Sequence, residues 1–372
     1  MVVDRFFYTE QPSIPLLQPL NEGTMTTGNP HHSTLLLGID FGTSRTAVMS
    51  NRKTKELVHS VVGYPRDIIG VKILNRTQVI GIEALEKRSL LELHFPLENG
   101  VLREGSEKEL EAAHELLRYT IELAEPRAGD KICGVLGVPA RASVANKEQL
   151  LKLTDGLMDI AMVVSEPFMV AYGLGKLTNA FIVDIGAGTT DICAMKGTVP
   201  SVENQATILK GGDYVDDLLV SAILDAYPTA QMDRHVARRI KEKFAFVGEP
   251  GEPVVQILRL NGKPTEVDLT DAVRSACETM VPDIVEHLKR LLLVFDADHQ
   301  AEALSNIILA GGGSRIRGLG AMIGHHLREY GDVRVTMVAD PDFSGAQGAL
   351  KLAMELPPEY WNQIGDVIGT VG

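Results

Sequence analysis

A hairpin-like motif occurs twice in this chain, and its repetition constrains the fold more than any other feature. The first copy is LLLGIDFGTSRTAVMS, residues 35–50, and the second is AFIVDIGAGTTDICAMK, residues 180–196. Each copy consists of an apolar strand, an aspartate, a glycine turn, a threonine and a second apolar strand. When the copies are aligned without a gap, four positions agree: Asp40 with Asp184, Gly42 with Gly186, Thr46 with Thr190, and Val48 with Ile192. A repeated motif of this kind indicates two half-domains built on one plan.

The turns of the two hairpins carry residue types that bind phosphate and magnesium. Glycine permits positive φ angles and close approach to a ligand, so converging backbone N–H groups can form an anion-binding nest. Hydroxyl donors are present in both turns: Thr43, Ser44, Thr189 and Thr190. An aspartate just before each turn, Asp40 or Asp184, indicates a phosphate that carries Mg²⁺, because this ion prefers carboxylates and keeps its waters. Either hairpin alone could be an ordinary turn, but a facing pair would clamp a triphosphate and its metal.

A third glycine-rich segment is IILAGGGSRIRGL, residues 307–319, in which an apolar strand precedes a turn and a predicted helix start. It lacks the Lys-Ser/Thr ending of a P-loop, and its glycines do not have the Rossmann spacing. Its suitable role is a flat backbone surface on which a nucleoside can lie, formed by Gly311, Gly312, Gly313 and Ser314. Glycine turns between strand and helix are common, so this segment supports the hairpin pair without identifying a site alone.

Strands and helices alternate along most of the chain, which predicts an α/β protein with a mixed central sheet. Residues 1–33 are rich in Pro, Asn, Gly and Thr and lack periodicity, so we expect a flexible extension there. Helices are expected near residues 106–124 and 143–157. A longer helical pattern covers 269–294, with Thr270 as the expected N-cap, and Pro282 predicts a kink or a break within it.

Composition and charge disfavour several classes of protein. The chain of 372 residues is 45% hydrophobic, and no apolar run approaches the roughly 18 residues that a membrane helix needs. Its N-terminus carries acids and prolines, so it resembles neither a signal peptide nor a basic membrane-binding helix. A formal net charge of −13 argues against nucleic acid as a routine partner. Cys133, Cys193 and Cys277 are odd in number and far apart, which predicts buried, reduced thiols and a cytosolic compartment.

The three glycine-rich segments, in this order, resemble the actin, Hsp70 and sugar-kinase superfamily. Its two phosphate loops are similar to residues 38–48 and 182–192, its adenosine motif to 307–319, and its connecting motif to VVSEPFMVAYGLGK, residues 163–176. The resemblance implies an actin-like fold, with two duplicated βαβ-containing halves around a central nucleotide cleft. It divides the chain into an extension at 1–33, a first half at 34–180 with a small subdomain at about 56–110, a second half at 181–354 with a small subdomain at about 213–275, and a C-terminal segment at 355–372 that packs on the first half.

Segments outside this shared core favour the actin branch of the superfamily. Residues 79–102 and 238–248 resemble actin segments beside the nucleotide, and GGDYVDDLL, residues 211–219, is similar to a turn that bacterial actins and Hsp70 place there. An Hsp70 would require a substrate-binding domain after residue 372, and a sugar kinase would need a sugar-binding acid that we do not find. Within the bacterial actins, SVVGYPRDIIG, GVPARASVANK and ELPPEYWNQIGDVIG resemble the actin-like proteins that organise magnetosomes.

By this resemblance, the cleft binds ATP or ADP together with Mg²⁺. Asp40 and Asp184 would hold the metal largely through its waters. The phosphates would be held by the backbone amides of Gly42, Thr43, Ser44, Gly186, Ala187, Gly188 and Thr189. Lys241 and Glu242 would reach the adenosine, Gly212 would lie beside the nucleotide, and Asn99 stands where actin has a histidine. Glu166 would lie near the metal and orient the attacking water; its other interpretation is an acid at a helix start, just before Pro167.

The function that the resemblance implies is an ATPase that forms cytoskeletal filaments, uses ATP hydrolysis for filament turnover and positions magnetosomes. Its expected partners are further copies of the chain and magnetosome-associated adaptor proteins, with no nucleic acid and no direct membrane insertion. Its expected location is the cytoplasm, along the magnetosome chain. Two alternatives stay open: a monomeric kinase or phosphatase of the same superfamily, and a nucleotide-gated scaffold with little turnover.

Overall fold

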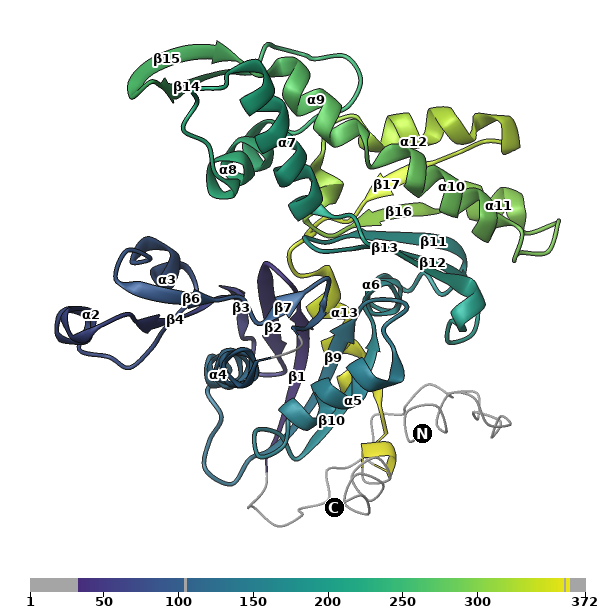
Figure 1. Ribbon diagram of the computed structural model, residues 1–372. Coiled ribbons are helices and arrows are strands. Elements are labelled where there is room, and N and C mark those ends of the chain that lie inside the picture. Colours follow the sequence, from purple (N-terminus) through teal and green to yellow (C-terminus); the bar gives the residue numbers. More distant parts are fainter. Residues whose placement is uncertain (1–32, 104–105, 358, 362–372) are drawn as a thin grey trace.

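The computed structural model describes residues 33–103, 106–357 and 359–361 (Figure 1). The predicted N-terminal extension lies outside these residues except for Ser33, and so does most of the predicted C-terminal segment. Two α/β halves, each with a five-stranded sheet, lie one above the other in Figure 1. Two smaller subdomains project from the halves on the same side of the molecule.

The first sheet contains a three-stranded antiparallel meander and two parallel crossover strands. Its strands are β1 (Thr34–Phe41), β2 (Arg45–Ser50), β3 (Lys55–His59), β9 (Lys131–Val138) and β10 (Ile160–Ser165). Their order is β10-β9-β1-β2-β3, in which β9 runs parallel to both β1 and β10. Parallel neighbours need a crossover, which is usually a helix, and α4 (Glu107–Glu122) and α5 (Val144–Leu153) form these connections.

The second sheet repeats this topology strand for strand. Its strands are β11 (Thr178–Ile185), β12 (Thr190–Lys196), β13 (Gln205–Ile208), β16 (Ile307–Ala310) and β17 (Val335–Met337), in the order β13-β12-β11-β16-β17. The hairpin register is repeated as well, because Ile39 pairs with Val48 in the first hairpin and Val183 pairs with Ile192 in the second. The predicted α/β fold of two duplicated halves is therefore confirmed.

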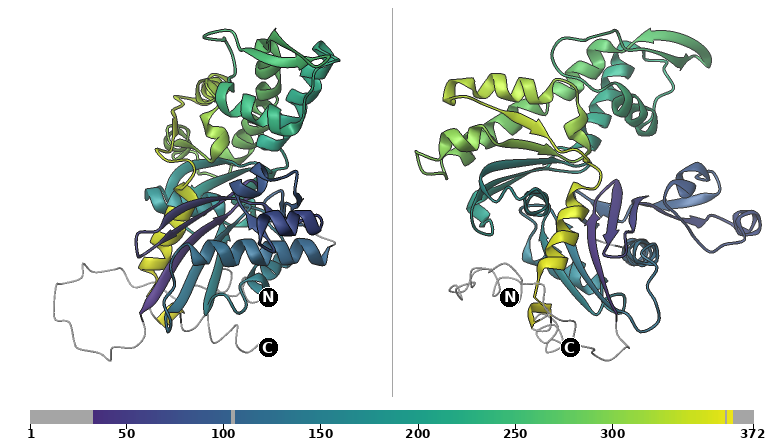
Figure 2. Two further views of the ribbon diagram at one scale, coloured as in Figure 1. Left: turned by 90° about the vertical axis from the view of Figure 1, so that its left-hand side faces the viewer. Right: turned by 180° about the vertical axis from the view of Figure 1, so that it is seen from behind.

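Helices separate the two sheets and cover their outer faces (Figures 1 and 2). Between the sheets lie α6 (Glu166–Leu174) and α13 (Ser344–Glu355), whereas α10 (Val281–Leu292) and α12 (Leu319–Leu327) pack on the outer face of the second sheet. Side chains alternate along the strands accordingly. In β11, Phe181 and Val183 belong to the core shared with α10 and α12, while Ala180 and Ile182 belong to the core shared with α6 and α13. Both faces of the sheet are thus buried, which explains its nearly continuous apolar strands.

Helix α13 packs on the first half, although the division expected from the resemblance keeps residues up to 354 in the second half. It contacts β1, β9 and α6. A Cβ atom at Gly348 would come within 1.8 Å of the Met169 carbonyl oxygen in α6. Because glycine has no side chain, the two helices can approach at backbone distance, and the chain returns to the first half before residue 355.

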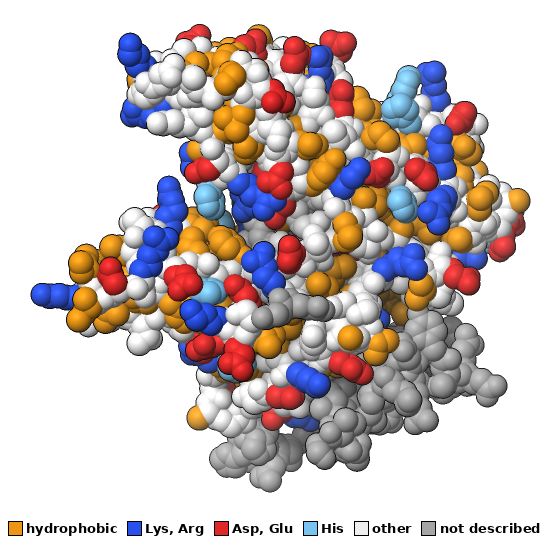
Figure 3. All heavy atoms as spheres, in the orientation of Figure 1, with side chains coloured by type: hydrophobic (Ala, Val, Ile, Leu, Met, Phe, Trp, Pro, Cys, Tyr) orange, Lys and Arg blue, Asp and Glu red, His pale blue; other side chains and the backbone are white. Residues whose placement is uncertain are grey.

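The two small subdomains are insertions into the halves. The first contains β4 (Val62–Pro65), α2 (Ile68–Leu74), β5 (Val79–Ile80), α3 (Ile82–Glu86), β6 (Leu91–His94) and, nearer the main sheet, the hairpin β7 (Leu97–Glu98) and β8 (Val101–Leu102). The second contains α7 (Gly212–Ala226), α8 (Arg234–Phe244), β14 (Val255–Leu260), β15 (Lys263–Asp268) and α9 (Thr270–Glu278). Because β3 belongs to the main sheet, the first insertion begins after His59 and not at about residue 56. Figure 3 shows the surface hollowed between the two subdomains.

The helical pattern at 269–294 forms two helices, α9 and α10, so the predicted break at Pro282 is confirmed. Pro282 lies in the first turn of α10, where its missing N–H leaves no helical hydrogen bond unmade. The predicted N-cap is wrong, because Leu269 holds that position and Thr270 is the first helical residue. The Thr270 hydroxyl instead accepts a hydrogen bond from the Val254 amide at 2.8 Å, which anchors the loop before β14 to the start of α9.

The remaining described elements are short. They are α11 (Gln300–Leu304) and three 3₁₀ turns at Val202–Asn204, Gly312–Arg315 and Arg328–Tyr330. Cys133, Cys193 and Cys277 are free and buried, as the sequence predicts. Among the helices of the described residues, none combines the length and the hydropathy needed to cross a bilayer.

Candidate functional site

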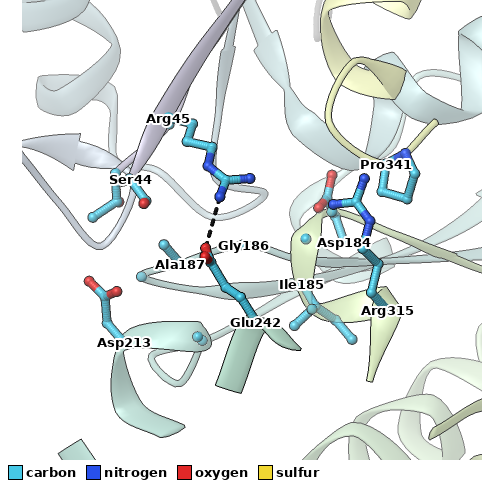
Figure 4. Close-up of a pocket in the computed structure, with 18 of the residues that line it drawn as sticks. Ser44, Arg45, Asp184, Ile185, Gly186, Ala187, Asp213, Glu242, Arg315 and Pro341 are labelled. Carbon is cyan, nitrogen blue, oxygen red and sulfur yellow. Dashed lines mark hydrogen bonds and ion pairs between the residues drawn. The ribbon is translucent and has the colours of Figure 1, made fainter. Parts of the chain in front are cut away.

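A cleft of about 500 Å³ lies between the two halves, where the turns of both hairpins meet (Figure 4). Most of the predicted site residues line it: Asp40, Gly42, Thr43, Ser44, Glu166, Asp184, Gly186, Ala187, Gly188, Thr189, Gly212, Lys241, Glu242, Gly311, Gly312 and Gly313. One wall comes from the β1–β2 turn and the start of α6. The opposite wall comes from the β11–β12 turn, α7, α8 and the glycine turn after β16. The tertiary structure therefore brings together segments that are far apart in the sequence.

Two predicted residues do not line the cleft. Asn99 lies in the turn between β7 and β8, and its neighbour Gly100 lines the cleft instead. Ser314 is buried, and its hydroxyl donates a hydrogen bond to the Gly311 carbonyl oxygen at 2.7 Å. The Ser314 side chain thus closes the glycine turn from within.

The two hairpin turns touch across the cleft, and Gly188 makes this contact possible. A Cβ atom at Gly188 would come within 2.7 Å of the Asn99 Cα and 2.9 Å of Thr43 Oγ1. Thr43 Oγ1 accepts a hydrogen bond from the Gly100 amide at 2.8 Å, so the first turn is also fixed to the β7–β8 turn. A side chain at position 188 would push the turns apart, and the glycine therefore sets the width of the cleft.

Three carboxyl groups line the cleft: that of Asp184 is buried, and those of Asp40 and Glu166 are partly buried. Burial raises the pKa of Asp40 to about 6. Burial also raises the pKa of Glu166 well above its usual range, and the charges of Asp40, Asp191 and Asp184 raise it further. The pKa of Asp184 is raised by burial and then by Asp40 and Asp191. These shifts come from burial and, for Glu166 and Asp184, from repulsion by neighbouring carboxyl groups, and a cation bound beside the three acids would favour their ionised forms.

The donor set of this carboxyl group cluster fits a hydrated Mg²⁺ ion. Within the described part of the chain, no three His, Cys, Asp or Glu side chains are close enough to hold one ion directly. Mg²⁺ usually binds through one or two carboxylates and substrate phosphates and keeps several waters. Asp40 and Asp184 could therefore hold the ion through its waters, with phosphate oxygens completing the shell.

Asp191 is a further buried carboxyl group, which the sequence pattern missed although it lies within the second motif. It occupies the position that Ala47 holds in the first hairpin. Its carboxylate accepts hydrogen bonds from the Thr189 hydroxyl at 2.7 Å and the Thr207 hydroxyl at 2.6 Å. It also accepts one from the Ala140 amide of the first half at 2.8 Å. Asp191 therefore ties the two halves together beside the cleft.

Lys241 and Glu242 are neighbours on α8 with different surroundings. Lys241 Nζ donates a hydrogen bond to the Gly212 carbonyl oxygen at 2.6 Å and pairs with the buried Asp216 at 2.7 Å. Lys241 thus joins α8 to the start of α7 and fixes the Gly212 turn. Glu242 extends across the cleft to Arg45 (Figure 4). The two residues therefore contribute differently, Lys241 by holding the wall and Glu242 by facing the opening.

Four charged side chains form what we call the mouth cluster: Arg45, Glu242, Arg315 and Asp342. Arg45 lies 2.8 Å from Glu242 and 3.4 Å from Asp342. Arg315 donates two hydrogen bonds to Asp342, at 2.9 and 2.8 Å. Of these four residues, Glu242 is predicted from the sequence by resemblance, and the other three are not. Arg45 and Arg315 adjoin predicted turn residues, which is a usable signal, whereas Asp342 lies in the connection between β17 and α13 and has none.

Part of the cleft wall is apolar. Val215, Ala245, Met280 and Ile316 line it, and Ile316 follows the glycine turn directly. A cleft that combines an acidic, metal-compatible part with an apolar part suits a ligand that has both a charged and a flat apolar portion. A nucleotide is such a ligand.

Comparison with known proteins places these features in a family. The family model described as MreB/Mbl protein matches residues 34–357. The actin-like protein MamK of Paramagnetospirillum magneticum is 55% identical over 336 residues, which cover 90% of this chain and 97% of that protein. A solved structure of the MamK double helical filament superposes with a TM-score of 0.86 at 54% identity, over 87% of this chain and 100% of the other. A non-polymerising MamK mutant bound to AMPPNP gives a TM-score of 0.68 at 54% identity, over 87% and 99%.

Proposed function

Since the chain belongs to the MreB/Mbl family of actin-like proteins, we propose that it is an ATPase whose copies assemble into filaments. The observation that carries this proposal is the pair of hairpins with the same register, each of which delivers an aspartate and a glycine turn to one cleft. Two solved MamK structures support it, because one is a double helical filament and the other is a non-polymerising mutant bound to AMPPNP.

The nucleotide would lie across the cleft with its phosphates between the hairpin turns. Backbone amides of residues 42–44 and 186–189 would hold the phosphate oxygens, as converging N–H groups do in anion-binding nests. Bound Mg²⁺, held through its waters by Asp40 and Asp184, would neutralise charge on the phosphates. The nucleoside would lie against the glycine turn after β16 and the apolar wall, and Glu242 would reach it from α8.

Glu166 would orient the attacking water. It is the first residue of α6, it lines the cleft, and its pKa is raised by burial and by the neighbouring carboxyl groups. Phosphoryl transfer depends mainly on positioning and electrostatics, and a carboxyl group within reach of the water can align it with the terminal phosphate and accept its proton. Asp40 and Asp184 would hold the metal, so the roles of the three carboxyl groups differ.

The biological role would follow from assembly. By resemblance to the MamK proteins, the filaments would organise and position magnetosomes in the cytoplasm, along the magnetosome chain. The partners would then be further copies of the chain and adaptor proteins on magnetosomes. The two alternatives predict different behaviour: a monomeric kinase or phosphatase would show the same specific activity at every protein concentration, and a nucleotide-gated scaffold would assemble with ATP but release little phosphate.

The test combines sedimentation and phosphate release for wild type and Glu166→Gln with ATP and Mg²⁺. Wild type should pellet above a threshold concentration, and its ATPase activity should rise with assembly. Glu166→Gln should still bind nucleotide and pellet, while phosphate release falls on the order of 10²-fold, or about 2.7 kcal/mol of barrier. The matched control is Glu107→Gln, because Glu107 is also the first residue of a helix, α4, but does not line the cleft.

Each outcome tests either the role of Glu166 or the assembly of filaments. Wild-type phosphate release from a folded, polymerising Glu166→Gln protein would overturn the assignment of Glu166. An equal loss in Glu107→Gln would show that any acid at a helix start has this effect. A protein that stays in the supernatant at all concentrations, with constant specific activity, would refute filament assembly in favour of a monomeric enzyme.

A further inference from the structure

The side chain of Arg45 crosses the cleft from the first half to the second. Arg45 begins β2, directly after the first phosphate turn, and its guanidinium lies 2.8 Å from Glu242 on α8 of the opposite half. Figure 4 shows the two side chains pointing toward each other across the pocket, with their ion pair drawn between them. The second arm of the guanidinium lies 3.4 Å from Asp342, in the connection that leads from the second half back to α13. Arg45 therefore contacts the other half at a helix and at the returning chain.

The position of this pair makes it an obstacle to a ligand in the cleft. Arg45 and Glu242 line the cleft, and each retains part of its solvent exposure, 30% and 47% of the side chain. A nucleotide entering or leaving must pass side chains that bridge the opening. The halves also cannot move apart without separating the two charges.

We propose that the Arg45–Glu242 pair is a latch that holds the two halves closed over bound nucleotide and has to open for nucleotide exchange. The proposal rests on the proposed function, since it assigns a regulatory role to the same cleft. Arg45 is thereby a positioning residue: it acts through Glu242 and the closure of the halves, and its effect falls on the rate of nucleotide release.

The surroundings of the latch favour an ion pair of moderate strength. Burial lowers the pKa of His59, the cross-strand neighbour of Arg45, and the positive charge of Arg45 lowers it further. His59 therefore stays neutral near pH 7 and does not compete with Arg45 for Glu242. Asp342 stays ionised because its hydrogen bonds with Arg315 lower its pKa, and this pair holds it beside Arg45. Arg45 thus keeps two anionic partners within the mouth cluster.

Partial exposure also limits the size of the effect. Exposed ion pairs contribute about 0.2–1 kcal/mol, which corresponds to a change of roughly 1.4- to 5-fold in a rate or an equilibrium. An ion pair of this strength breaks and re-forms frequently, so it can slow nucleotide release without preventing it. Such a pair is also screened by salt, so the latch should weaken as ionic strength rises.

The experiment is a double-mutant cycle on the release of fluorescently labelled ADP, measured by stopped flow in the presence of Mg²⁺. The variants are Arg45→Met, Glu242→Gln and the double variant. Each single variant should release ADP about 2- to 5-fold faster than wild type, and the double variant should be no faster than the faster single variant. The matched control is Arg76→Met, because Arg76 forms an ion pair with Glu83 at 2.9 Å within the first subdomain and does not line the cleft.

The cycle separates the latch from direct contact of Arg45 with phosphate. If the two side chains acted independently on the nucleotide, the accelerations would multiply in the double variant, and the latch would be refuted. Unchanged release from Arg45→Met, or an equal acceleration in Arg76→Met, would refute it as well. In wild type alone, release should accelerate several-fold between about 0.05 and about 0.5 M salt, and constant release would count against the latch even if a variant failed to fold.

A titration of wild type with ADP distinguishes this proposal from the function on which it rests. Absence of binding would overturn both the nucleotide function and the latch. Tight binding of ADP, with release that is insensitive to Arg45→Met, would overturn the latch and leave the nucleotide function standing.

Discussion

Replacement of Gly348 by alanine should destabilise the protein, although alanine is normally the better residue in a helix. Gly348 lies within α13, at the place where this helix crosses α6. A Cβ atom there would lie 1.8 Å from the Met169 carbonyl oxygen and 3.2 Å from the Gly173 amide nitrogen. Both obstacles are backbone atoms of α6, so no side-chain rotation can make room.

The magnitude follows from two opposing terms. In a helix free of contacts, glycine to alanine stabilises by about 1 kcal/mol. In the protein, the methyl group must retreat from 1.8 Å to an ordinary contact of 3.4 Å, so the two helices must separate by roughly 1.6 Å. Overpacking a close-packed core costs about 1–3 kcal/mol, and a backbone obstacle places this site at the upper end. We therefore expect a net loss of about 2 kcal/mol in the free energy of unfolding.

The assay is urea unfolding of the nucleotide-free protein followed by circular dichroism, in which the midpoint should fall while the slope stays unchanged. The matched control is Gly324→Ala, because Gly324 is also inside a helix, α12, and a Cβ atom there would meet nothing closer than 3.9 Å. This control should gain up to about 1 kcal/mol. Phosphate release should also fall in Gly348→Ala, since α6 carries Glu166 at its first position. A midpoint for Gly348→Ala at or above that of wild type would refute the reasoning.

Two further predictions concern the cleft and its surroundings. Gly188→Ala should weaken nucleotide affinity by about tenfold in isothermal titration, because the new methyl group would push the hairpin turns apart, and unchanged affinity would show that the turns do not need to touch. His59 has a pKa lowered below 6.5 by burial and by Arg45, so the unfolded state binds more protons and stability should decrease as the pH falls below about 6.5. Melting temperatures measured across this range should depend less on pH in His59→Gln, and an equal dependence in both proteins would remove His59 as the cause.

The parts of the site that local chemistry encodes could be predicted from the sequence. The two hairpin turns could be recognised because a turn that approaches phosphate needs glycine, and a metal-linked phosphate needs a carboxylate beside it. The break at Pro282 was predictable for a similar reason, since proline fits the first turn of a helix and not its interior. The repeated motif also predicted the duplicated fold, because two copies of one motif imply two copies of one topology.

The mouth cluster could not be predicted in the same way. Arg45 and Glu242 are separated by 197 positions in the chain, and nothing near either residue in the sequence points to the other. The interpretation of Lys241 as an adenosine contact also lacked the information that its ammonium group is held by Gly212 and Asp216. Long flexible side chains can reach several partners, and their choice depends on which elements pack nearby.

The sequence by itself determined which segments carry the residue types of phosphate-binding turns and that the fold is duplicated, because donor types and strand patterns are properties of a few adjacent residues. The tertiary structure decided where these segments stand relative to one another. It placed α13 on the first half through backbone contact at Gly348, and it set the width of the cleft at Gly188. It also brought Arg45 to Glu242. These features depend on close packing between elements that are distant in the chain, and close packing is a property of the whole folded molecule.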